Sequence, residues 1–198
     1  AALSSCALAL GYRPAASCAL CWILTTSLHA RCPLALHGGD VLLRLLLFGT
    51  LFLDFSAPSH RKVEGLAAQG ARRDAGTTRG WAGAALRAQA ALVYACAAWA
   101  KRGSPAWWSE CTAVHDALQL DLVSSEVGRT LLRRAPSAVL CGLTRGTFLL
   151  EAAAPVLLMM PWRAGRLAAV LALLGMHAGF GICLRLGLFP LVSAVALL

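Results

Sequence analysis

Three ionisable side chains lie within apolar segments or at the end of one, and these are the residues that could do chemistry. Glu151 and His177 lie well inside such segments, and Lys101 ends the segment that begins at Leu92. A charge placed in apolar surroundings must change its protonation state, find a partner or carry a large desolvation cost. Each position is therefore a candidate functional site, and acid–base chemistry is the reaction type that these side chains suit.

Glu151 needs a partner that its own segment does not supply. Arg145 is six residues earlier, and side chains at that spacing do not face each other on a helix. We expect the partner on another helix, either as a structural ion pair or as part of a functional site. Arg44 is a further charge inside an apolar segment, and its long side chain can extend to the membrane surface.

His177 and Lys101 each have two interpretations. Gly175 and Gly179 flank His177 at a spacing that permits another helix to approach closely, so the imidazole is either a hydrogen-bonded packing residue or a catalytic one. Lys101 either extends from a helix end to the interface or acts as a base. The sequence around them has none of the common hydrolase, phosphate-binding or dinucleotide-binding motifs.

The apolar segments that must position these residues dominate the chain. Hydrophobic residues make up 59% of it and charged residues only 14%, which leaves too little polar surface for one soluble domain of 198 residues. The sequence therefore predicts an all-α, polytopic transmembrane helical bundle, with about six spans at roughly 20 residues each. It also predicts one domain over residues 1–198, a fragment cut inside a helix at both ends. The apolar segments are 15–28, 41–55, 90–100, 137–160 and 167–198.

The charges predict an orientation in the membrane. The net charge is +9, but Lys and Arg lie between apolar segments rather than along one face, so nucleic acid is not an expected partner. The net charge of Lys and Arg over Asp and Glu is +1, +3 and +2 in the connections 11–14, 56–85 and 161–166, and 0 and +1 in 29–40 and 101–136. The first three are expected in the cytoplasm and the other two on the outer side.

This orientation places the candidate residues at different depths. Lys101 is expected at the outer end of its span, with His177 facing the same outward-opening cavity as its nearest polar neighbour. Glu151 is expected deeper, toward the cytoplasmic half. In the long outer connection, residues 113–123 are expected to form a short surface helix with its acidic residues in water, and Trp107-Trp108 suits an interfacial aromatic belt.

Cysteine and turn residues complete the prediction. Cys18 and Cys21 have the spacing of a redox motif, but they lie in an apolar helix, where packing is the expected role. No set of four metal ligands is visible, so no metal site is predicted. Gly38-Gly39-Asp40 is expected to form a turn and an N-cap for the following helix. The eight cysteines are Cys6, Cys18, Cys21, Cys32, Cys96, Cys111, Cys141 and Cys183.

Several short segments together resemble the HTTM family, the membrane domain that vitamin K-dependent γ-carboxylases share with bacterial relatives. The resemblance covers most of the chain and depends on the order and spacing of the segments. They are Ser27-Leu-His-Ala-Arg31-Cys-Pro, Gly38-Gly-Asp40-Val-Leu-Leu-Arg44, Gln89, Tyr94 to Lys101, Trp108 with Thr112-Ala-Val, Leu118-Gln-Leu-Asp121, Glu151-Ala-Ala-Ala-Pro155, His177 and Gly187-Leu-Phe189-Pro190.

The resemblance implies a role for Lys101. In carboxylases of the family, the lysine at this position acts as the base on reduced vitamin K, and the product of that reaction removes a proton from a substrate Glu before CO2 is added. The chain departs from the family pattern at Cys111, where Gly is common, at Arg102, where an apolar residue is common, and at Asp54, where Pro is usual. The large lumenal region that binds the substrate propeptide in animal carboxylases has no counterpart here.

Two functions follow as expectations. The first is a quinol-coupled, carboxylase-like enzyme that modifies a peptide or lipid at the outer membrane face, with Lys101 and His177 as catalytic residues and a reduced quinone as cofactor. The second is a non-catalytic membrane factor for maturation or export of a small secreted peptide, as in the branch related to maturation of a sporulation-delaying toxin. Glu151 and His177 would then be structural. Both place the protein in the lipid bilayer of a bacterial cytoplasmic membrane.

Overall fold

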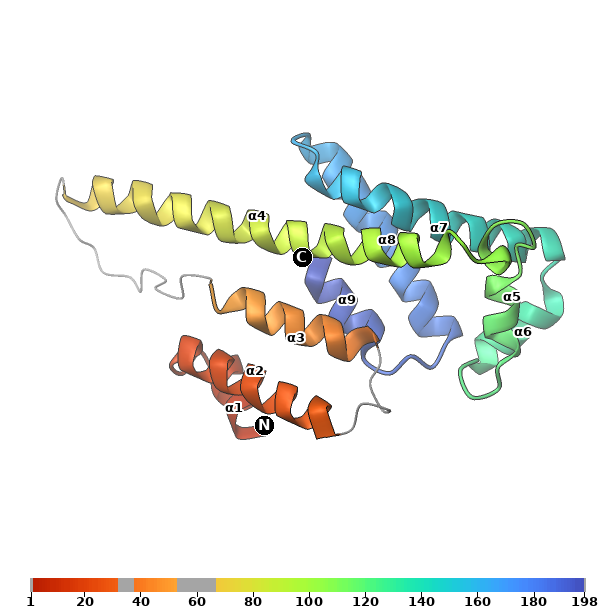
Figure 1. The fold of residues 1–198 in the computed structure, drawn as a ribbon, viewed down its shortest axis with the longest axis horizontal. Coiled ribbons are helices and arrows are strands. Elements are labelled where there is room, and N and C mark those ends of the chain that lie inside the picture. Colours follow the sequence, from red (N-terminus) through yellow and green to blue (C-terminus); the bar gives the residue numbers. More distant parts are fainter. Residues whose placement is uncertain (1, 32–37, 53–66, 198) are drawn as a thin grey trace. The chain divides into compact units, whose positions relative to one another are not determined.

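The described part of the chain is entirely helical. The computed structural model describes residues 2–31, 38–52 and 67–197, without the side chains of 67–80 and 82, and no named strand occurs among them (Figure 1). The prediction of an all-α fold is confirmed. The chain divides into two compact units, Ala1–Leu86 and Arg87–Leu198, which are described separately below.

Unit 1 contains α1 (Ala2–Ala9), α2 (Pro14–Arg31), α3 (Gly38–Thr50) and the N-terminal part of α4 (Ala67–Lys101). The turn between α1 and α2 has positive φ angles at Gly11 and Arg13, and Pro14 begins α2, where its missing N–H costs no hydrogen bond. The predicted N-cap at Asp40 is wrong, because α3 begins at Gly38 and Asp40 lies in its first turn. A carboxylate there still interacts favourably with the helix dipole.

Small polar side chains hold unit 1 together. Ser17 Oγ donates to Tyr12 O at 2.7 Å, across the turn between α1 and α2. Cys18 Sγ lies 3.0 Å from Thr50 Oγ1, which joins α2 to α3, and buried Cys21 contacts Ser5. The predicted packing role of these two cysteines is confirmed.

Unit 2 contains the C-terminal part of α4 and the helices after it. α4 (Ala67–Lys101) is followed by η2 (Pro105–Trp107), α5 (Ala113–Gln119), α6 (Glu126–Arg134), α7 (Ser137–Met159), α8 (Arg163–Cys183) and α9 (Phe189–Leu197). α7 and α8 pack as a hairpin, and the core joins them to α4. Small residues on each helix permit this close approach. The buried core residues are Ala90, Ala91, Tyr94, Ala154, Leu158, Ala169 and Leu173.

Two parts of the predicted connections are helical. Residues 67–85, expected within a cytoplasmic connection, belong to α4, and the many Ala residues among them favour helix. Of the expected surface helix over 113–123, Ala113–Gln119 form α5 and Asp121 lies in the turn that follows, and both Asp116 and Asp121 are exposed. Residues 56–66, Cys32 and Asp54, about which the sequence also made predictions, lie outside the described residues.

The expected number of spans is wrong for the described residues. Only α7 and α8 are both long and apolar enough to cross a membrane. α3 is too short for the roughly 30 Å of hydrocarbon, and charged or polar residues interrupt α4, while α2 ends in a polar Thr-Thr-Ser-Leu-His-Ala-Arg sequence.

The apolar side chains of α7 and α8 are mostly not covered by the rest of the protein. Within the apolar 18-residue stretch of each helix, only 28% of α7 and 17% of α8 is buried inside the protein. A core helix of a soluble domain would be mostly buried, so this exposure favours contact with lipid. Residues such as Leu149, Val156, Leu167 and Leu171 are each more than half exposed.

Candidate functional site

Lys101 and Glu151 form an ion pair between two helices of unit 2. Lys101 is the last residue of α4, and its Nζ donates to Oε2 of Glu151, which lies two-thirds of the way along α7. The side chain of Glu151 is 7% exposed and that of Lys101 is 22% exposed. The partner of Glu151 thus lies on another helix, as its spacing from Arg145 predicts. Because Lys101 is the more exposed residue of the pair, it is the one that another molecule can contact.

Tyr94 and His177 form a second polar contact in the same unit. A hydrogen bond of 2.8 Å joins Tyr94 Oη on α4 to His177 Nε2 on α8, and both side chains are buried. Phe180 and Phe189 pack their rings edge-on against the imidazole. His177 Nδ1 is buried and has no hydrogen-bond partner among the described residues. The imidazole is therefore held in place by one hydrogen bond and two aromatic contacts.

Helix geometry explains why α4 supplies one member of each contact. Tyr94 and Lys101 are seven residues apart, which is about two helical turns, so both side chains lie on the same face of α4. That face also carries Ala90 and Ala91 into the core. Tyr94 was not named as a site residue from the sequence. Its seven-residue spacing from Lys101 places both side chains on one helix face and could have indicated it.

Aromatic rings cover the end of α4. Lys101 Nζ lies 4.8 Å from the ring centroid of Trp107 in η2, a cation–π distance. The guanidinium of Arg102 stacks on Trp99 at 3.3 Å, so this second cation is directed to a different ring. Trp108 packs edge-on against Phe148 of α7 at 5.3 Å. Of the two tryptophans expected in an aromatic belt, Trp107 contacts Lys101 and Trp108 packs on the helix that carries Glu151.

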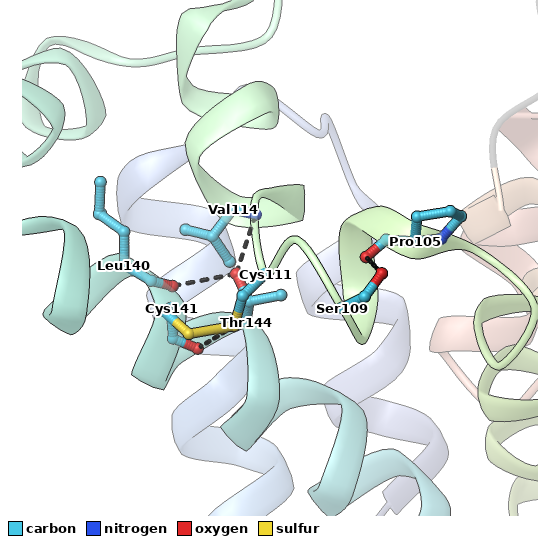
Figure 2. Close-up of a disulfide and its surroundings, with 7 residues drawn as sticks. All are labelled: Pro105, Ser109, Cys111, Val114, Leu140, Cys141 and Thr144. Atoms are coloured by element: carbon cyan, nitrogen blue, oxygen red, sulfur yellow. Dashed lines mark hydrogen bonds between the residues drawn. A yellow bond between two sulfur atoms is a disulfide. The ribbon is translucent and has the colours of Figure 1, made fainter.

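A disulfide fixes the segment after η2 to the beginning of α7. Cys111 and Cys141 are bonded, and Thr144 one turn later accepts a hydrogen bond of 3.2 Å from Val114 N, as Figure 2 shows. Thr144 Oγ1 in turn donates to Leu140 O at 2.9 Å. Among the described residues, this is the one bonded pair of cysteines. The sequence did not predict it, because only Cys18 and Cys21 were given a role and none was assigned to Cys111 or Cys141.

The segment before α6 is held against the end of α8. Arg185 N donates to Val123 O at 2.6 Å and Ser125 N donates to Cys183 O at 3.0 Å. A Cβ at Gly128 would lie 2.3 Å from Cys183 O, so this position on α6 requires glycine. On the exposed side of α6, Arg129 donates to Glu126 and lowers the pKa of that carboxyl. These contacts close the end of unit 2 at which Lys101 lies.

The structure changes how the predicted site residues are grouped. Lys101 was expected to have His177 as its nearest polar neighbour, with Glu151 deeper. Instead Lys101 contacts Glu151, and His177 contacts Tyr94. The expectation failed because sequence gives a residue's distance from its own helix end but not how far a neighbouring helix is shifted along it.

The remaining predicted residues lie apart from these contacts. Arg145 is exposed on α7, and Arg44 belongs to unit 1. The expected close helix approach at Gly175 and Gly179 is wrong for the described residues, since a Cβ at either position would meet no atom within 4 Å. Small residues on α4 make that approach instead. No group of three or more potential metal ligands occurs in the part of the chain that the structure describes.

The arrangement can hold and transfer protons. It places an ammonium beside a carboxylate and a phenol beside an imidazole, on three helices and within one unit. Comparisons with protein-family models, curated proteins and solved structures gave no significant match to the chain. The function of this site must therefore be inferred from its geometry, and the HTTM resemblance stays a prediction.

Proposed function

We propose that this chain is a multi-pass protein of a bacterial cytoplasmic membrane, with the Lys101 end of unit 2 on the outer side. The uncovered apolar surfaces of α7 and α8 support a membrane location. The Cys111–Cys141 disulfide supports the orientation, because disulfides persist in oxidising compartments and are rare in the cytosol. Arg163 and Arg166 begin α8 at the opposite end of the hairpin, where the positive-inside rule expects them.

Cysteine labelling tests this orientation. The background keeps Cys111 and Cys141 and replaces the other cysteines, and a new cysteine is placed at Ser104 or at Ala164. In intact cells an impermeant thiol reagent should label Ser104→Cys, whereas Ala164→Cys should react only after the cells are opened. Equal labelling of both variants in intact cells, or the reverse pattern, would contradict the proposed orientation.

For the activity, we infer that Lys101 is the base of a carboxylase-like reaction coupled to a reduced quinone. The observation that carries this proposal is the pairing of a partly accessible lysine with a nearly inaccessible carboxylate. A base must first lose its own proton, and Glu151 is placed to take that proton from Nζ while remaining shielded from water. Lys101 would then accept a proton from the hydroxyl of a bound quinol.

The residues near Lys101 suit a reduced quinone by their chemistry. The lysine offers a hydrogen-bonding group and Trp107 offers a flat apolar ring beside it. The quinone would supply the oxidisable ring that amino acid side chains lack. The backbone at Cys111 adds support for the HTTM resemblance, because its φ of 62° is one that glycine adopts freely and relatives commonly have glycine there.

Two measurements test the activity. Quinone should co-purify with the full-length protein in mild detergent, and membranes supplied with reduced quinone, oxygen and labelled bicarbonate should incorporate label into peptide or lipid. Lys101→Met should lose incorporation beyond any loss of folded protein, which thermal unfolding of the same sample measures. Arg102→Gln is the matched control and should retain it, since Arg102 stacks on Trp99 rather than contacting Glu151. Incorporation at wild-type level by Lys101→Met would overturn the proposal.

The alternative, a non-catalytic factor for maturation or export of a secreted peptide, is favoured by a different observation. Lys101 and Glu151 satisfy one another, and Tyr94 Oη shares a hydrogen bond with His177 Nε2. Such contacts also hold helices together in lipid without any chemistry. Lys101→Arg separates the two functions, because arginine keeps the ion pair but does not act as a base near neutral pH. Peptide maturation at wild-type level in this variant would support the alternative.

A further inference from the structure

Unit 1 has a groove between α2 and α3 that is separate from the Lys101 site. The groove has a volume of about 320 Å3 and is open on one side. α2 contributes Trp22 and Thr26, and α3 contributes the other lining residues, which are Val41, Arg44, Leu45 and Phe48. The groove is therefore apolar and aromatic, with a single cation.

Two polar groups in the groove lack partners within the described residues. Thr26 Oγ1 is buried and makes no hydrogen bond, although a threonine hydroxyl in a helix commonly bonds to the carbonyl one turn earlier. No ion pair or hydrogen bond of Arg44 occurs in the described part of the chain. Asp40, one turn before Arg44 on α3, lies 4.0 Å from His29. The Arg44 guanidinium thus remains available to an anion, and the Thr26 hydroxyl needs a partner that the described residues do not supply.

The apolar walls indicate that the anion is the head of an amphiphile. The rings of Trp22 and Phe48 pack together at 5.4 Å, and the exposed side chains of Val41 and Leu45 extend the same apolar surface. Inorganic phosphate would leave these walls uncovered, whereas an acyl chain would bury them. Arg is also the residue best suited to phosphate oxygens, through two parallel hydrogen bonds.

We propose that this groove binds one anionic phospholipid, with its phosphate at Arg44 and Thr26 and an acyl chain along Trp22, Val41, Leu45 and Phe48. This proposal rests on the proposed membrane location but not on the chemistry proposed for Lys101. From the sequence, the Arg44 side chain was expected to extend to the membrane surface. In this proposal the side chain instead binds the phosphate of one lipid. The lipid would also add contacts between α2 and α3.

Native mass spectrometry of the full chain, released from nanodiscs that contain phosphatidylglycerol and phosphatidylcholine, tests the proposal. The wild type should retain one phosphatidylglycerol in preference to phosphatidylcholine. Arg44→Gln should weaken retention about tenfold, through loss of charge-assisted hydrogen bonds, and Arg44→Lys should keep part of it. Arg31→Gln is the matched control and should bind as wild type, because Arg31 is exposed at the end of α2.

Two further variants keep the test decisive if Arg44→Gln does not fold. Val41→Trp should block the groove while leaving the cation in place, and it should also lose the lipid. Lys101→Met should bind lipid as wild type, which separates this proposal from the one for the catalytic site. Retention that is equal for both lipids, or unchanged in Val41→Trp, would overturn the proposal. Displacement of the lipid by excess inorganic phosphate would likewise overturn it in favour of a soluble anion.

Discussion

The two units bury polar groups of different kinds. Among the described residues of unit 1, the buried polar side chains are the neutral Ser4 and Ser17, together with the thiols of Cys18 and Cys21, and the ionisable His29 is only partly covered, with its side chain 10% exposed. In unit 2 they include the ionisable Glu151 and His177. A neutral hydroxyl or thiol can be satisfied by a nearby backbone carbonyl, as Ser17 is by Tyr12 O.

Ionisable groups make stricter demands on the fold. A carboxylate in low dielectric needs a particular partner, and Glu151 finds it on a helix fifty residues away. Unit 2 should therefore depend on a few specific long-range contacts, whereas unit 1 should tolerate the loss of any single polar group. The predictions below test this difference, from the largest expected effect to the smallest.

Glu151→Lys should be the most destabilising change. It places a second ammonium beside Lys101 in a nearly inaccessible site, and breaking such a pair costs about 3–5 kcal/mol of unfolding free energy. Glu151→Gln keeps the size and a hydrogen-bonding oxygen, so its cost should be much smaller. Thermal unfolding in mild detergent measures both. Arg145→Gln on the exposed face of the same helix is the control, and equal stability of all three variants would show that the pair does not hold unit 2 together.

Opening the disulfide should have the next largest effect. Cys111 and Cys141 are 30 residues apart, and closing a loop of that length stabilises the folded chain by about 3–4 kcal/mol. Unfolding with and without reductant, compared between wild type and Cys111→Ser, measures it. Cys96→Ser removes an exposed free cysteine of the same unit and should leave the reductant effect intact. A wild type that is indifferent to reductant would indicate that η2 and α5 are held by other contacts.

Tyr94→Phe should cost about 1–3 kcal/mol, because it leaves His177 buried with neither ring nitrogen hydrogen-bonded among the described residues. The ring of residue 94 remains in the core, so the loss can be assigned to the hydroxyl. Calorimetry of this variant beside Tyr12→Phe, whose hydroxyl is on an exposed residue, gives the comparison. Equal stability of the two variants would mean that the Tyr94–His177 contact contributes no net stability.

Cys18→Ala in unit 1 should have the smallest effect, below about 1 kcal/mol. The thiol is buried and contacts Thr50 Oγ1, but that hydroxyl also donates to Leu47 O at 2.8 Å and stays satisfied without the sulfur. Hydrogen exchange of α2 and α3 measures the local change. A loss as large as that for Tyr94→Phe would remove the proposed difference between the units.

Some of this structure follows from local properties of the sequence. Helix formation, the turn before Pro14 and the short helix at Ala113–Gln119 each depend on residues close in the chain. The number of spans was overestimated because apolar content alone does not set helix length. Residues 41–55 read as one apolar segment, yet α3 ends at Thr50.

The sequence by itself determined that the chain is helical, that much of its surface is apolar, and that Glu151 cannot pair within its own helix. These depend on composition and on the fixed spacing of residues along a helix. Only the tertiary structure decided that Lys101 is the partner of Glu151, that Tyr94 is the partner of His177, and that Cys111 is bonded to Cys141. Each of these contacts depends on how far neighbouring helices are shifted and rotated against one another, and the packing of many small side chains sets that geometry collectively.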